Sequence, residues 1–141
     1  MSADDRLEIL ELPARYSHAW DAADTDAYAA LFTDDAIFEL RRAGSDEPAL
    51  RLEGRKAIRA WAAERHAARP AGEQPRAHAG GTVIELLEAD AARGRTMLLQ
   101  TIVGAVGGAP RTTVSGVYRE QWRRTPNGWR FAGRRLRLDV P

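Results

Sequence analysis

The sequence predicts a single α+β domain in which helices precede a long, mainly antiparallel sheet. Apolar residues recur at helical spacing near the start of the chain and again over residues 55–69. The second half instead contains strand-like segments that are separated by turn sequences. Helices followed by strands argue against an alternating βαβ arrangement. At 141 residues the chain suits one domain, residues 1–141.

The composition excludes several classes of function. A formal net charge of +1 gives no electrostatic case for binding nucleic acid or an acidic membrane. Without cysteine, the chain has no disulfide, zinc–thiolate site or cysteine nucleophile. No apolar run approaches the about 20 residues of a membrane span, and the first ten residues lack the basic and apolar regions of a signal peptide. We therefore expect a cytoplasmic protein that binds neither nucleic acid nor membrane.

The first helix is expected to begin after Ser2, whose hydroxyl can cap a first turn that carries two aspartates. Pro13 removes one backbone donor within the helical pattern and should kink or divide the helix. Two apolar stripes follow helical spacing, one of Leu7, Leu10 and Ala14 and the other of Ile9, Leu12, Tyr16 and Trp20.

Three further elements are expected before the second half of the chain. Asp24 or Thr25 can cap a short helix that buries Tyr28, Leu31 and Phe32. Residues 33–42 are typical of a loop followed by a strand, and turn-rich residues 42–54 can join two short strands as a hairpin. The third helix, residues 55–69, carries a stripe of Ile58, Trp61, Ala62 and Arg65.

The second half predicts an antiparallel meander. Turn sequences, "EADAARG", "GGAPR" and "TPNG", separate its strands. A long, twisted antiparallel sheet curls when one face must cover helices. Helices packed in the concave face would leave a cone with an open mouth. The predicted strands are residues 82–88, 96–106, 112–124 and 129–140.

Stretches from nearly the whole chain resemble the SnoaL-like branch of the NTF2-like superfamily. They are "RYSHAWDAADTDAYAALFTDDAIFE", "LEGRKAIRAW", "GGTVIEL" and "SGVYREQWRRTPNGWRFAGRR", in the order of the family. The superfamily includes ketosteroid isomerases, scytalone dehydratases and the small subunits of ring-hydroxylating dioxygenases. The resemblance implies the cone-shaped fold and a homodimer formed by the outer face of the sheet. It does not define a reaction, because the scaffold serves many activities and also inactive binders.

Most acids near the start of the chain are interpreted as structural. Asp21, Asp24, Asp34 and Asp35 fall where the family keeps acids at helix ends and at the turn from helix to strand. Helix capping and turn formation explain such acids.

Tyr16 is a candidate catalytic residue by resemblance. In the similar isomerases a tyrosine at this place donates a hydrogen bond to a developing oxyanion, which a phenol in an apolar cavity does well. The alternative is a core tyrosine whose hydroxyl is satisfied by the backbone. Leu40 stands where the isomerases carry their carboxylate base, and where scytalone dehydratase carries a tyrosine. A leucine moves no proton, so steroid isomerisation by that route is not expected.

His78, in "RAHAGGTVIEL", is the candidate acid–base group. Scytalone dehydratase resembles this stretch, with a histidine shortly before its Gly-Gly-Thr, and a neutral histidine in a pocket suits proton transfer near pH 7. The alternative is an exposed loop histidine. The second histidine of that enzyme would fall near Ile102, where this chain has none. His18 and His66 are expected at the surface.

Tyr118 and Glu120 share one face of a predicted strand with Trp122, and we interpret that face as the inner one. A glutamate that points into the protein interior destabilises the fold unless a group of opposite charge pairs with it. Arg134 or Arg135 on the next strand could pair with it. The alternative is that Glu120 works as an acid or base with a raised pKa.

The pocket wall is expected to be aromatic, which favours a small apolar or aromatic ligand. No His, Asp or Glu group has metal-ligand spacing, and no Gly-rich phosphate loop follows a strand, so neither metal nor cofactor is expected. Limonene epoxide hydrolase chemistry is set aside, because no aspartate closely follows Arg93 or Arg95. The candidate wall residues are Trp20, Phe32, Phe38, Leu40, Trp61 and Trp122.

These observations lead to two hypotheses. The first is a cofactor-independent dehydratase, cyclase or isomerase that acts on an apolar, oxygenated, cyclic metabolite. In it, His78 moves the proton while Tyr16 and Tyr118 bind an enol or carbonyl oxygen. The second is a ligand-binding or structural subunit domain without catalysis, which the leucine at position 40 and the missing second histidine favour.

Overall fold

The computed structural model describes residues 2–141 and confirms the α+β class. Within that range no helix is both long and apolar enough to cross a membrane. The helices are α1 (Ala3–Asp21), α2 (Thr25–Ala29) and α3 (Arg55–Ala67). The strands are β1 (Phe32–Arg41), β2 (Leu50–Glu53), β3 (Gln74–Leu87), β4 (Ala91–Val103), β5 (Arg111–Thr125) and β6 (Gly128–Leu138).

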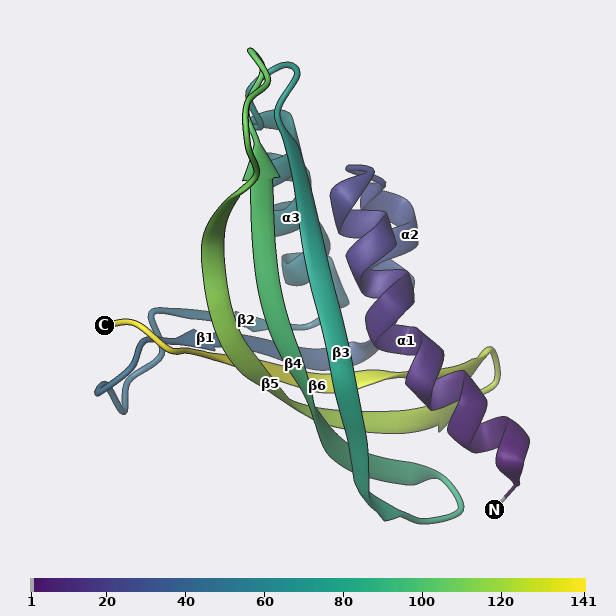
Figure 1. Ribbon diagram of the computed structural model, residues 1–141. Helices are drawn as coiled ribbons and strands as arrows, with labels where there is room; N and C mark the ends of the chain where they lie inside the picture. Colours follow the sequence, from purple (N-terminus) through teal and green to yellow (C-terminus); the bar gives the residue numbers. More distant parts are fainter. Residues whose placement is uncertain (1) are drawn as a thin grey trace.

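All strands form one sheet in the order β2-β1-β6-β5-β4-β3. Every neighbouring pair is antiparallel except β1 and β6, which run parallel. The long strands curve strongly, and the helices lie on the concave side (Figure 1). Helix α1 packs against β3 and β6, while α2 and α3 pack against each other and α3 reaches β1. The predicted cone is therefore the observed architecture.

Helix α1 begins with the expected cap. The Ser2 hydroxyl accepts a hydrogen bond from the Asp5 backbone N–H (3.1 Å), and the Asp5 carboxylate accepts one from the Ser2 backbone N–H (3.2 Å). Pro13 is buried within α1, yet the helix continues to Asp21. Of the two expected effects, a kink or a division, the division does not occur, because a proline removes only one of the many intrahelical bonds.

Strand boundaries differ most at β3 and β1. β3 begins at Gln74 rather than at residue 82, so it contains His78. β3 lies at the edge of the sheet next to β4, and an edge strand tolerates Pro75. β1 begins at Phe32, so Asp34 and Asp35 lie in a strand instead of a loop.

The acids assigned to structural roles have structural partners. Asp24 caps α2 by accepting a hydrogen bond from the Ala27 backbone N–H (3.0 Å). Asp21 is buried and accepts one from the Ala77 backbone N–H (3.1 Å), which ties the end of α1 to β3. On the surface, Asp34 pairs with Arg55 and Asp35 pairs with Arg123. Their strand position corrects the predicted turn, but the structural interpretation holds.

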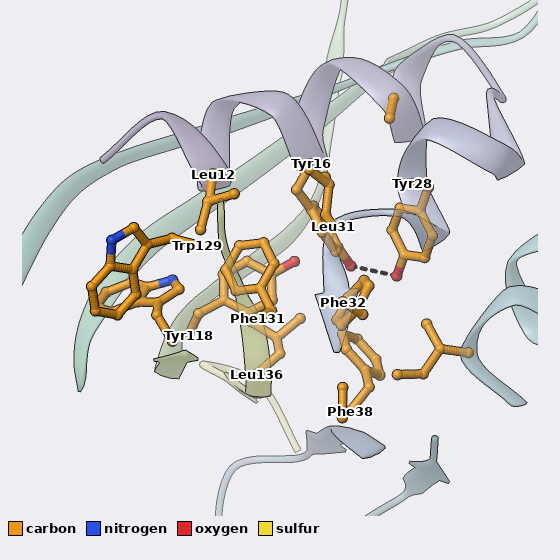
Figure 2. Packing of buried hydrophobic residues seen from close by; sticks show 14 of the residues in the cluster. Leu12, Tyr16, Tyr28, Leu31, Phe32, Phe38, Tyr118, Trp129, Phe131 and Leu136 are labelled. Carbon is orange, nitrogen blue, oxygen red and sulfur yellow. Dashed lines mark hydrogen bonds between the residues drawn. The ribbon is translucent and has the colours of Figure 1, made fainter. Parts of the chain in front are cut away.

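The hydrophobic core lies between the three helices and the concave face of the sheet, and aromatic rings supply much of its bulk (Figure 2). Phe32 and Phe131 are fully buried, with ring centroids 5.5 Å apart. The Trp129 indole N–H donates a hydrogen bond to the Asp5 carboxylate (3.0 Å), which joins the start of α1 to β6. Phe32, Phe38 and Trp122, three of the expected wall residues, belong to this core.

Candidate functional site

Six buried polar side chains meet inside the cone, and we call them the inner polar cluster. α1 and α2 each contribute one member, and three neighbouring strands contribute the rest. The pairing register of the strands brings the strand members together, since Tyr118 lies opposite Thr96 and Glu120 lies opposite Arg134. The members are Tyr16, Tyr28, Thr96, Tyr118, Glu120 and Arg134.

An ion pair forms the base of the cluster. Arg134 Nε donates a hydrogen bond to Glu120 Oε1 (2.8 Å), and neither side chain is exposed (0%). The Thr96 hydroxyl donates to Glu120 Oε2 (2.7 Å), so both carboxylate oxygens are occupied. Burial raises the pKa of Glu120, although Arg134 opposes that shift. The predicted inward, paired Glu120 is confirmed, and its partner is Arg134, whereas Arg135 pairs with Glu39.

The rest of the Arg134 guanidinium faces aromatic rings. Its central carbon lies 3.5 Å from the centroid of the Tyr118 ring and 4.0 Å from that of Tyr16. These are cation–π contacts, which attract the charge. The two terminal nitrogens, Nη1 and Nη2, are buried and have no hydrogen-bond partner. The interior therefore contains a positively charged group with unused donors.

Phenol hydroxyls gather beside this group. The Tyr28 hydroxyl donates a hydrogen bond to the Tyr16 hydroxyl (2.9 Å), and the rings of Tyr16 and Tyr118 lie 6.0 Å apart (Figure 2). Burial raises the pKa of all three tyrosines, so the phenols stay protonated at neutral pH. A neutral phenol in an apolar interior is a hydrogen-bond donor rather than a base.

Aromatic rings lead from the cluster to the rim of the cone. Trp20 stacks on Trp61 (centroids 5.3 Å apart, 25° between planes) and lies 5.3 Å from Tyr28. Phe38 lies 5.5 Å from Trp61. Trp20, Trp61 and Leu40 are half-buried. Trp20 also borders a cavity of about 260 Å³, the rim cavity, with Arg65, Ala68, Arg69, Pro70, Glu73, Pro75, Gln100 and Ile102.

The structure does not bring His78 to the cluster. Its side chain is exposed on the outer face of β3, and Nε2 lies 3.0 Å from the Thr101 hydroxyl. Because β3 begins at Gln74, strand alternation turns Ala77 toward the core and His78 away from it. The expectation that His78 shares an interior with Tyr16 and Tyr118 is therefore wrong.

His66 is the histidine that faces the interior. It is half-buried, its Nδ1 lies 2.8 Å from the Thr25 hydroxyl, and its ring packs 4.7 Å from Trp20. Nε2 is buried without a partner. Burial, together with the nearby Arg69 charge, lowers the pKa of His66, which favours a neutral ring. The surface position expected for His66 is wrong, whereas His18 is exposed as expected.

The sequence contained signals for two of the missed residues. His66 follows Ala62 by four positions and Ile58 by eight, which places it on the buried stripe of α3. Local pattern predicts that Tyr28 is buried, but it does not show which group the Tyr28 hydroxyl contacts. Arg134 could not be separated from Arg135 before the register of β6 was known. Within residues 2–141 no group of three His, Asp or Glu side chains could hold a metal ion.

Comparison with protein-family models matches residues 1–135 to the SnoaL-like domain. No protein with a curated description matches the chain. Among solved structures, an NTF2-like protein with a cystatin-like fold from Novosphingobium aromaticivorans is 30% identical, with a TM-score of 0.77 over 96% of this chain and 82% of that chain.

Two other solved structures from the same organism are similar. A proposed aromatic ring hydroxylase is 28% identical, with a TM-score of 0.81 over 100% of this chain and 93% of that chain. A proposed scytalone dehydratase is 20% identical, with a TM-score of 0.79 over 99% of this chain and 89% of that chain, a similarity of fold alone. With a family model matching nearly the whole sequence, and with an NTF2-like relative at 30% identity, this chain belongs to the SnoaL-like family.

Proposed function

We propose that this protein is a cofactor-independent enzyme that acts on an apolar, oxygenated, cyclic small molecule inside the cone. The observation that carries the proposal is the hydrogen bond between the buried hydroxyls of Tyr28 and Tyr16, beside the equally buried Tyr118. These phenols would bind a carbonyl or enol oxygen of the ligand. The reaction would be a dehydration, a cyclisation or an isomerisation.

The chemistry follows from what these reactions require. Removing a proton beside a carbonyl moves negative charge onto the oxygen, and fixed donors in an interior without water stabilise that charge. The Tyr16 hydroxyl accepts a hydrogen bond from Tyr28, so its own proton can be donated to a ligand oxygen. The raised pKa of Tyr16 keeps that proton in place at neutral pH. Tyr16 would thus be a catalytic donor.

A ligand would enter past the aromatic rim. Trp20 borders the rim cavity and contacts the Tyr28 ring, so the stacked Trp20 and Trp61 rings lead toward the phenols. Flat aromatic faces favour a ring-shaped ligand. SnoaL-like membership supports this reading, as does the shared fold of a proposed scytalone dehydratase.

The proton acceptor we propose is His66 rather than His78. The His66 ring contacts Trp20 at the rim, and its Nε2 is buried and unpartnered. A neutral imidazole with a free nitrogen suits proton transfer near pH 7. Glu120 fits less well because both of its oxygens accept hydrogen bonds.

Turnover assays of single variants test the proposal. A panel of cyclic hydroxy ketones would be screened with the unaltered protein, and the best substrate carried forward. Tyr16→Phe should lower kcat about 10²-fold to 10³-fold, because it deletes one donor to the oxyanion. His66→Gln should also lower kcat, whereas the matched change His78→Gln should not. Full activity in Tyr16→Phe would contradict the assignment, and loss in His78→Gln alone would contradict the choice of base.

A second candidate is a ligand-binding domain without catalysis. It is favoured by the occupied oxygens of Glu120, which leave no free carboxylate base in the inner polar cluster. Saturable calorimetric binding of a hydroxy ketone, with no product after long incubation at high protein concentration, would support this candidate and refute the enzyme.

We also infer a homodimer formed through the outer face of the sheet. Apolar side chains are exposed there on β3 and β4, with Met97 at 59% exposure, and contiguous exposed apolar residues often mark an interface. Light scattering after size exclusion should give about twice the 15.6 kDa chain mass. Met97→Glu should shift the mass toward the monomer, and a wild-type monomer refutes the inference. The other exposed members are Val83, Leu86 and Leu99.

A further inference from the structure

Arg134 is more deeply buried than its hydrogen bonds explain. Its side chain has no exposure, yet only Nε has a hydrogen-bond partner, the Glu120 carboxylate. Both Nη1 and Nη2 are enclosed without a partner. A buried donor that forms no hydrogen bond destabilises the fold, and native proteins rarely leave such groups without a role. Ring faces attract the cation, but they accept N–H donors only weakly.

We propose that Nη1 and Nη2 of Arg134 bind the carboxylate group of the ligand, so that the protein selects ring-shaped carboxylic acids over their neutral analogues. The inference deepens the proposed function by naming a substrate class, and it rests on that function for placing the ligand inside the cone.

The geometry of the ion pair supports a carboxylate. A guanidinium presents its terminal nitrogens as a flat fork that matches the two oxygens of a carboxylate. The bond from Nε to Glu120 sets the orientation of the fork, and the contacts with Tyr16 and Tyr118 fix it further. Glu120 is thus a positioning residue. A carboxylate can accept a hydrogen bond from each terminal nitrogen with a separate oxygen, whereas a carbonyl group offers only one oxygen.

The charges of the cluster are compatible with an incoming anion. Glu120 and Arg134 neutralise each other, so a ligand carboxylate would add one negative charge to the interior. The phenols of Tyr16 and Tyr118 lie against the same guanidinium and stay protonated, so they add no negative charge beside the incoming anion. Glu120 is the one carboxylate of the inner polar cluster, and it is already neutralised by Arg134.

The apolar body of the ligand would lie toward the rim. Trp20 contacts Tyr28, and the Tyr28 hydroxyl reaches Tyr16, whose ring covers Arg134. This succession runs from the half-buried tryptophans to the buried guanidinium. It suits a molecule with aromatic rings at one end and an acid at the other.

Calorimetric titration tests the inference directly. The probes are benzoate, 2-naphthoate and anthracene-2-carboxylate, each compared with the primary amide of the same ring system. The wild-type protein should bind at least one acid about tenfold to a hundredfold more tightly than its amide, as expected for hydrogen bonds to a charged group. Arg134→Lys keeps the charge but loses the fork, so the preference should shrink.

The decisive variant removes both charges. Arg134→Met/Glu120→Met leaves no unpaired charge in the interior, and it should bind acid and amide equally. Arg137→Met is the matched control, because Arg137 is exposed on the same strand, and it should keep the full preference. Circular dichroism checks the fold of each variant. If the double variant does not fold, Arg134→Lys carries the test, and an undiminished preference in that variant overturns the inference.

The outcomes separate this inference from the proposed function. Equal binding of acid and amide by the wild type, or no binding of any acid, overturns the inference. If the two bind equally and Tyr16→Phe weakens both, the inference fails while the phenol site stands. If the acid preference depends on Arg134 but no cyclic hydroxy ketone or hydroxy acid is turned over, the inference stands and the enzyme proposal fails.

Discussion

Glu120 and Arg134 lie directly opposite each other on β5 and β6, and their side chains form an ion pair of 2.8 Å that is closed to solvent. The pair determines which guanidinium nitrogens can bind another group. Nε already donates to Glu120, whereas the terminal nitrogens Nη1 and Nη2 have no hydrogen-bond partner. It also couples the stability of the sheet to the candidate site, since each partner needs the other to remain charged in the interior.

The first prediction concerns that coupling. Arg134→Met should lower the free energy of unfolding by about 3–5 kcal/mol, because the Glu120 carboxylate then stays buried without its partner. Arg134→Met/Glu120→Met should recover most of the loss, since neither charge remains. Urea denaturation at neutral pH measures both, with Arg137→Met as the exposed control. A single variant as stable as the wild type would show that the pair is dispensable.

The second prediction concerns the tyrosine pair. Tyr28→Phe should lower the free energy of unfolding by about 1–3 kcal/mol, because the Tyr16 hydroxyl loses its buried partner. Tyr16→Phe should have a similar cost. In the double variant the losses should not add, and a double-mutant cycle should give a coupling of about 0.5–1.5 kcal/mol. Additive losses in chemical denaturation would mean that the two hydroxyls do not interact.

The third prediction concerns acid stability. Arg124, followed by Trp129, holds the pKa of Asp5 well below its ordinary value. A carboxyl whose pKa is lower in the folded state stabilises the fold above its unfolded pKa of about 3.9, and that contribution disappears as the pH falls through the folded pKa. Asp5→Asn should therefore be less stable than the wild type at pH 7, and the difference should vanish in strong acid. Chemical denaturation at a series of pH values measures this difference in stability, and Asp4→Asn, at an exposed position, is the control. A difference that persists in strong acid would rule out titration of Asp5 as its cause.

The fourth prediction concerns His66. Burial lowers the pKa of this imidazole, so the unfolded chain binds its proton more readily than the folded chain does. Stability should then fall as the pH drops below the unfolded pKa of about 6.5. Melting temperatures of the wild type and of His66→Gln should converge as the pH falls from 8 toward 5. His18→Gln, at an exposed position, should melt in parallel with the wild type; parallel curves for His66→Gln would contradict the prediction.

Much of the fold could be predicted from local pattern. Alternation along residues 112–124 correctly assigned Tyr118, Glu120 and Trp122 to one buried face. Helical spacing correctly placed Tyr16 in the core. Both patterns work because the side-chain period of an element is set by its own backbone geometry.

His78 shows what local sequence pattern cannot predict. The sequence pattern predicts that His78 precedes a strand at residues 82–88, but β3 begins at Gln74 and alternation turns the His78 side chain outward. Where a strand begins depends on whether a neighbour pairs with it, and here the partner is β4, whose Leu99 lies opposite His78. A shift of one residue in such a strand moves a side chain to the other face.

By itself the sequence determined the order of helices and strands and the buried face of β5, because these follow from periodicities within single elements. The family was indicated instead by the resemblance of particular stretches of sequence. Only the tertiary structure decided that Arg134 rather than Arg135 meets Glu120. Trp129 and Phe131 face inward, and unbroken alternation would continue that face to Arg135, but a register shift near Ala132 brings Arg134 inward instead. A bulge depends on the pairing of two strands, so neither strand alone encodes which arginine is buried.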